Sequence, residues 1–148
     1  MYVYISYSEM TTGGGIRAGE ENEEWPPSQN PTYIDFVLKQ VYIGEEEKIN
    51  KSKTVGWEKH REKVFFHAKE GSEVHIVVVR YKDGDTFGTS HGNFYIEGVY
   101  ATYDEAYNVS EAIYNKTYKG GEYNYVPWEG YFSSLEDVEI HTRTVRKI

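Results

Sequence analysis

The run from residue 74 to residue 81 is apolar on both of its alternating faces. Strand geometry separates its side chains into two sets: Val74, Ile76 and Val78 on one face, and Val77, Val79 and Tyr81 on the other. A strand with two apolar faces belongs in the middle of a sheet that is covered on both sides. The chain therefore has to place other strands beside this segment and pack something on each face.

Alternating β-prone residues predict further strands over residues 2–7, 33–43, 93–101 and 134–145. Residues 57–68 are also interpreted as a strand, although their charged half would tolerate a helical turn. The order of these elements predicts an α+β fold, a mostly antiparallel sheet of about five to six strands with one main helix packed on one face.

The main helix is predicted at about residues 103–119. Thr102 and Glu105 have the spacing of a capping box, in which the side chains at the first and fourth positions satisfy free backbone N–H groups. Apolar residues then recur at helical spacing, and Gly120 and Gly121 end the helix.

Length and composition indicate one domain over residues 1–148, with a long loop rich in Gly, Glu and Pro at about residues 8–31. The net charge of −8 argues against a protein that grips nucleic acid. The chain has no cysteine, and we identify neither a secretory signal nor a membrane span, so we expect a cytoplasmic protein without a membrane partner. The sequence leaves open whether it forms a homo-oligomer.

The glycine-rich stretch from Tyr81 to Asn93, between two predicted strands, is the first candidate for ligand contact. Its backbone amides and hydroxyls could hold an anion, or the stretch could be a hairpin loop in which Asp83 and Asp85 bond their own amides. Arg17, in the first loop, and Trp128, between Pro127 and Glu129, are the other candidates. The predicted ligand-binding residues are Asp85, Thr86, Phe87, Gly88, Thr89, Ser90, His91, Arg17 and Trp128.

We assign no catalytic residue, metal site or cofactor. The glycine-rich stretch lacks the lysine and following helix of a P-loop, and no nucleophile motif is present. Metal ligation would need three or four converging side chains, and no second cluster accompanies Asp83, Asp85 and His91. A small hydrolase that uses Asp85 and His91 remains the enzymatic alternative.

A faint internal echo links the two glycine-rich regions. Residues 4–9 lead into Gly13 much as residues 78–83 lead into Gly84, each time from a strand through a tyrosine and an acid into glycine. If the echo is a structural repeat, the two loops lie side by side at one end of the sheet.

The C-terminal half resembles small uncharacterised proteins of tailed bacteriophages. The resemblance is carried by Tyr81-x-x-Gly84-Asp85-Thr86-Phe87-Gly88, by Gly98-Val99-Tyr100, and by the segment from Trp128 to Ile140. It implies a protein made in an infected bacterial cytoplasm, of a kind that often blocks host components, and it brings no catalytic residues.

The leading hypothesis is therefore a non-enzymatic binding protein that inhibits or sequesters a host defence factor. It would do so by protein contact or by holding a small nucleotide-like ligand. A structural or accessory phage protein is the third alternative.

Overall fold

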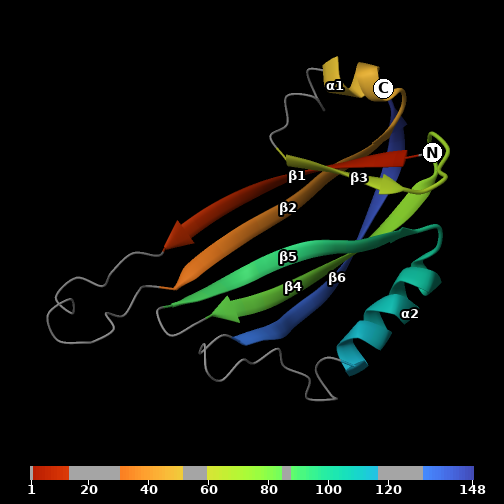
Figure 1. The fold of residues 1–148 in the computed structure, drawn as a ribbon. Coiled ribbons are helices and arrows are strands. Elements are labelled where there is room, and N and C mark those ends of the chain that lie inside the picture. Colours follow the sequence, from red (N-terminus) through yellow and green to blue (C-terminus); the bar gives the residue numbers. More distant parts are fainter. Residues whose placement is uncertain (1, 14–30, 52–59, 85–87, 117–131) are drawn as a thin grey trace, which may run out of the picture.

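The computed structural model describes residues 2–13, 31–51, 60–84, 88–116 and 132–148 of the chain. These residues form a six-stranded, mostly antiparallel sheet and two helices, one of them the main helix, so the predicted α+β fold is confirmed (Figure 1). In chain order the elements are β1 (Tyr2–Gly13), β2 (Thr32–Ile43), α1 (Glu46–Lys51), β3 (His60–Phe65), β4 (Glu73–Gly84), β5 (Thr89–Tyr100), α2 (Tyr103–Tyr114) and β6 (Phe132–Lys147).

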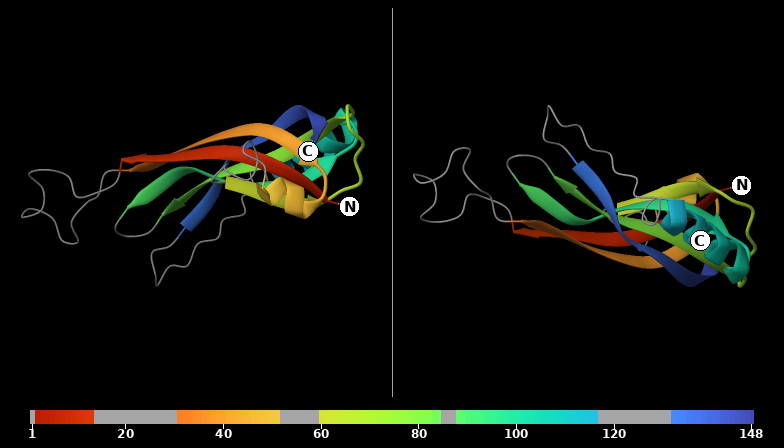
Figure 2. Two further views of the ribbon diagram at one scale, coloured as in Figure 1. Left: turned by 90° about the horizontal axis from the view of Figure 1, so that it is seen from above. Right: turned by 90° about the horizontal axis from the view of Figure 1, so that it is seen from below.

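The strands lie in the order β3-β1-β2-β5-β4-β6, and β2 also pairs with β6. Strand β2 is parallel to β5 and to β6. It pairs with β5 at its start, at Thr32 and Tyr33, and with β6 at its end, from Val41 to Ile43. The pairings of β2, β5, β4 and β6 thus close a ring, and the sheet curls strongly about its core (Figure 2).

The fold is built from two ββαβ units, β1-β2-α1-β3 and β4-β5-α2-β6. In each unit the first strand lies between the other two and pairs with both in antiparallel fashion. The register also repeats, including a shift at the same place: Ile5 and Tyr7 face Val41 and Leu38 in the first unit, and Ile76 and Val78 face Val99 and Ile96 in the second. The structure therefore contains a repeat, with Ile5 and Gly13 corresponding to Ile76 and Gly84. The sequence echo, which matched residues 4–9 with residues 78–83, was three residues out of this register.

Equivalent positions of the two units meet where β2 lies beside β5. Thr32 pairs with Ser90 and Tyr33 with His91, and the rings of Phe36 and Phe94 are 4.2 Å apart between centroids. Contact between like positions is what a two-fold axis produces in an isologous dimer interface. Because Thr32 also pairs with Gly13, and Gly84 with Thr89, the turn ends of both hairpins lie side by side.

The main core lies between the units. Strand β4 is buried on both faces, as its sequence predicts: its first set of apolar side chains joins the main core, while Val77 and Val79 alternate to the face on which α2 packs. Helix α1 covers a smaller cluster at the other end of the first unit, where Ile49 packs with Tyr4 and Tyr42. The buried residues of the main core are Val3, Ile5, Phe36, Leu38, Val41, Ile43, Ala68, Val74, Ile76, Val78, Ile96, Val99 and Val145.

The main helix begins as predicted. The Thr102 hydroxyl accepts a hydrogen bond from the Glu105 backbone N–H at 3.2 Å and donates one to the Glu105 carboxylate at 3.0 Å. Helix α2 extends to Tyr114, and the rest of the predicted helix, from residue 117, lies outside the described residues.

Two predictions of local structure are wrong, and one helix was not predicted. Residues 8–13, assigned to the first loop, continue β1 because pairing with β2 satisfies their backbone groups. Strands β4 and β5 likewise extend into the glycine-rich stretch, to Gly84 and from Thr89. The charged run after β2, for which the sequence predicted no element, forms α1, whose single buried side chain is Ile49.

Candidate functional site

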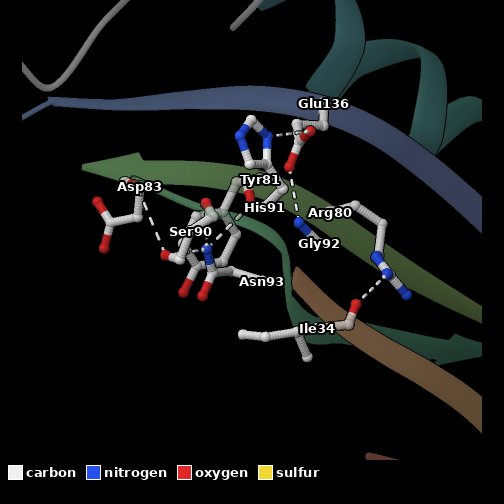
Figure 3. A network of polar contacts seen from close by, with 9 residues as sticks. All are labelled: Ile34, Arg80, Tyr81, Asp83, Ser90, His91, Gly92, Asn93 and Glu136. Carbon is white, nitrogen blue, oxygen red and sulfur yellow. Dashed lines mark hydrogen bonds and ion pairs between the residues drawn. The ribbon is translucent and has the colours of Figure 1, made fainter. Parts of the chain in front are cut away.

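A network of polar contacts ties β4, β5 and β6 together at the turn end of the second hairpin and reaches β2 (Figure 3). The side chain of Asn93 forms its centre. Its amide nitrogen Nδ2 lies 3.0 Å from the Ser90 carbonyl oxygen, 2.9 Å from Ser90 Oγ and 3.3 Å from the Tyr81 carbonyl oxygen. Two amide protons serve these three acceptors, so Asn93 holds the start of β5 against β4.

Glu136, on β6, binds the same turn from the other side. One of its carboxylate oxygens accepts the backbone N–H of Gly92 at 2.8 Å, and the other lies 3.4 Å from Nδ1 of His91. Gly92 has a φ of 75°, and a Cβ there would lie 2.4 Å from the Ile34 carbonyl oxygen. Glycine is therefore required both by its backbone conformation and by the close approach of β2.

Arginine side chains replace the missing sheet hydrogen bonds along the middle of β2. Between its short pairings with β5 and β6, this strand has carbonyl groups that face no ladder partner. Arg80 of β4 donates to the Ile34 carbonyl at 3.1 Å, and Arg143 of β6 donates to those of Leu38 and Lys39 at 2.8 and 2.9 Å. Because buried backbone acceptors need partners, the two guanidinium groups join the units where the strands diverge.

The imidazole of His91 is held on two sides. Its ring stacks on that of Tyr33, with centroids 5.2 Å apart, and it faces the Glu136 carboxylate. Both partners of the His91–Glu136 pair keep about a third of their side chains exposed, at 29% and 33%. An imidazole beside a carboxylate can exchange protons with a bound molecule, which is the chemistry that general acid–base catalysis needs.

Asp83 is the member of the network whose bonding is incomplete. Its backbone carbonyl accepts from Ser90 Oγ at 3.4 Å, but its buried Oδ1 has no hydrogen-bond partner among the described residues. The expectation that Asp83 ties the turn through its own carboxylate is therefore not supported within these residues, where Asn93 and Glu136 tie it. The same residues contain no group of three or more carboxylates and imidazoles placed to hold a metal ion.

Some of the predicted ligand-binding residues belong to this network. Ser90 and His91 take part in it, and Thr89 pairs with Gly84 at the start of β5, next to Gly88. The remaining predictions, Asp85, Thr86, Phe87, Arg17 and Trp128, lie outside the described residues.

Sequence reasoning missed the groups that organise the network, namely Arg80, Asn93 and Glu136. Asn93 follows a glycine at the start of a predicted strand, which is a signal for a side chain that bonds nearby backbone. Glu136 lies 44 residues from Gly92 in the chain, and nothing local marks the contact.

Burial changes the acidity of two neighbours on β1 and β3. Burial raises the pKa of the Glu62 carboxyl above its usual range. Burial also raises the pKa of the Tyr7 phenol, and the charges of Glu62 and Glu9 add to this effect.

A second candidate surface is the face of β1 and β2 that points away from the core, which we call the outer β1–β2 face. Met10, Tyr33 and Val37 are 64%, 51% and 56% exposed. The strand register places them together with Asp35, because Met10 pairs with Asp35 while Thr12 and Ser8 pair with Tyr33 and Val37. The alternate residue Phe36 points into the core, which fixes this face as the outer one.

Comparison with known proteins gave no matching family model, no similar curated protein and no similar solved structure. No helix within the described ranges is long and apolar enough to cross a membrane. The functional argument therefore depends on the geometry of the two candidate surfaces.

Proposed function

We propose that this chain is a non-enzymatic binding protein that acts by protein contact through the outer β1–β2 face. The observation that carries the proposal is the group of three large apolar side chains, Met10, Tyr33 and Val37, each more than half exposed on paired strands. Apolar groups gathered on one exposed sheet face are typical of interaction surfaces, and tyrosine is among the residues that contribute most to interface energies.

Charge indicates the kind of partner. The chain carries 24 acidic and 16 basic residues, and Asp35 lies within the outer β1–β2 face opposite Met10. A partner with an apolar patch surrounded by Lys and Arg would complement this face and would be steered toward it. Following the resemblance to phage proteins, we propose that the partner is a host bacterial protein of a defence system, which the chain inhibits or sequesters in the cytoplasm.

The polar network supports binding over catalysis. Asn93, Glu136 and Arg80 each form a hydrogen bond with a backbone group that joins neighbouring strands, which is a structural role. The hydrolase alternative would need Asp85 and His91 to act together, and loss of measured turnover in His91→Ala would favour it. The phage-accessory alternative would be favoured if no host protein bound.

The test compares two variants of the tagged full chain. The first, Met10→Ser with Val37→Ser, removes apolar contacts from the outer β1–β2 face. The second, Tyr107→Ser, alters an aromatic on α2 that is 48% exposed. We expect a host protein to copurify with the unaltered chain and with Tyr107→Ser, and to be lost with the double variant. The purified partner should then bind less tightly as salt is raised.

Two results would overturn the proposal. One is equal recovery of the partner by all three proteins. The other is self-association of the purified chain that the double variant abolishes in analytical ultracentrifugation, which would make the face a contact between copies of this chain.

A further inference from the structure

The structure has an open pocket of about 820 Å³. The elements that line it, among them α1 and the start of β1, lie at the end of the molecule opposite the turn between β4 and β5 (Figure 1). Its walls come from the start of β1, the end of β2, α1, β3, the β3–β4 connection and the end of β6. The volume falls within the range of about 300–1,000 Å³ that is usual for sites of small molecules.

The floor of this pocket is apolar and one wall is aromatic. Tyr4, Ile43 and Ala68 are each at least nine-tenths buried and line it. The Tyr2 ring stands beside them, 43% exposed, and is held from the side by the Phe65 ring at 5.4 Å between centroids. Lys63 Nζ lies over one face of the Tyr2 ring, 4.3 Å from its centroid, so a planar group has to pack against the opposite face to reach the apolar floor.

The rim of the pocket is rich in lysine and less acidic than the chain as a whole. Four lysines and three glutamates line it. Two of these lysines are neutralised locally, since Lys63 lies 3.4 Å from a Glu46 oxygen and Lys48 lies 4.0 Å from a Glu45 oxygen.

The other two lysines of the rim are Lys69 and Lys147. Neither has an ion pair within the part of the chain that the structure describes. The other carboxylates of the lining are Glu70 and the terminal carboxylate of Ile148. The rim therefore holds two ammonium groups without ion pairs in a protein of net charge −8.

We propose that this pocket binds a small phosphate-bearing ligand with a planar ring, of the nucleotide class. The ring packs against Tyr2 and the apolar floor, and the phosphate groups meet the ammonium groups of Lys69 and Lys147. Lysine binds phosphate as a point charge, so two lysines without ion pairs suit a flexible, doubly charged group. This inference does not depend on the proposed function, because it concerns a different end of the molecule.

The experiment is isothermal titration calorimetry on the full chain with ADP, adenosine and inorganic phosphate at low ionic strength. Diphosphates of guanosine, cytidine and uridine are titrated alongside, so that the choice of base does not decide the outcome. We expect at least one nucleotide to bind about tenfold or more tightly than its nucleoside and than inorganic phosphate, because only the nucleotide engages both parts of the site. Binding should weaken as salt is added.

Two variants locate the site. Lys69→Gln with Lys147→Gln removes the two lysines that have no ion pair, and Lys39→Gln, an exposed lysine on β2 outside the pocket, is the matched control. We expect the double variant to lose about tenfold or more in affinity, because it removes both ammonium groups that meet the phosphates, while the control keeps its affinity. Thermal unfolding of both variants checks that the fold is intact.

Three results would overturn the inference. The first is no binding by any nucleotide, and the second is equal binding by nucleotides and inorganic phosphate, which would remove the role of the ring. The third is nucleotide binding that the double variant leaves unchanged, which would place the ligand elsewhere.

Discussion

The two ββαβ units share a register but differ in what covers them. In the second unit α2, of 12 residues, packs on β4, β5 and β6, and β6 extends over 16 residues. In the first unit α1 has 6 residues and covers one end, and β3 has 6. The same strand plan thus yields one unit whose outer face is packed and one whose outer face stays open. This difference separates the part of the molecule that stabilises the fold from the part available for contact.

The largest expected effect tests whether the units unfold together. Ile5 and Ile76 occupy equivalent core positions, and both are fully buried. We expect Ile5→Ala and Ile76→Ala each to lower the free energy of unfolding by about 2–5 kcal/mol in a single transition in urea. Val37→Ala, on the outer β1–β2 face, should change it by less than about 0.5 kcal/mol. Two separate transitions in Ile5→Ala would show that the units are energetically independent.

The next effect concerns the contact between β2 and β5, where the two units meet. Gly71 and Gly92 both have positive φ, but a Cβ at Gly71 meets no atom within 4 Å, whereas one at Gly92 meets the Ile34 carbonyl oxygen. Gly71→Ala should cost about 1–2 kcal/mol from backbone strain alone. Gly92→Ala should cost about 1–3 kcal/mol more, because β2 has to move away. Equal losses in chemical denaturation would mean that the contact between β2 and β5 contributes little.

The helix that covers the second unit depends on its cap. Removing the Thr102 hydroxyl leaves the Glu105 N–H without its acceptor, so Thr102→Ala should lower the free energy of unfolding by about 1 kcal/mol. Thr102→Ser keeps the hydroxyl and should retain most of the stability. The exposed Thr12 of β1 is a matched control, since Thr12→Ala removes no helix cap. Equal stability of Thr102→Ala and the unaltered chain would contradict the role of the cap.

The smallest effect is confined to alkaline pH. Burial raises the pKa of Tyr100 from 10.0 to about 12, with further contributions from its hydrogen bond to Glu97 and from the charges of Glu97 and Glu105. Because the raised pKa means that the folded state favours the protonated phenol, its stabilising contribution is complete below pH 10.0 and is lost as the pH rises toward about 12.

Spectrophotometric titration of the unaltered chain and of Tyr100→Phe measures this contribution. The difference between the two curves should be one phenol that ionises near pH 12. If the missing phenol titrates near its ordinary pH, the hydrogen bond to Glu97 does not hold Tyr100 in its neutral form.

The sequence predicted the fold class because its strongest signals are local. The two apolar faces of residues 74–81 and the Thr102–Glu105 cap depend on neighbours a few positions away, and both are confirmed. Helix α1 was missed because its charged sequence has a single apolar anchor, Ile49, whose burial depends on Tyr4 and Tyr42 far along the chain.

The candidate site was less predictable for the same physical reason. Ser90 and His91 stood out as polar residues in a glycine-rich stretch, and both belong to the network. Their partner Glu136 comes from β6, far along the chain. The apolar residues Met10 and Val37 were not predicted to form a surface, because their exposure depends on which other elements pack on the sheet.

The contacts between equivalent residues of β2 and β5 have a genetic consequence. If the molecule were a dimer of one ββαβ unit, a single codon would encode both residues of each contact between equivalent positions. One mutation would then change both residues. In this chain the members are encoded separately. Positions 36 and 94 are both phenylalanine, whereas Tyr33 and His91 differ in type. One unit can thus carry an imidazole where the other carries a phenol. A tandem chain can thus vary one member of a contact while the other preserves the packing.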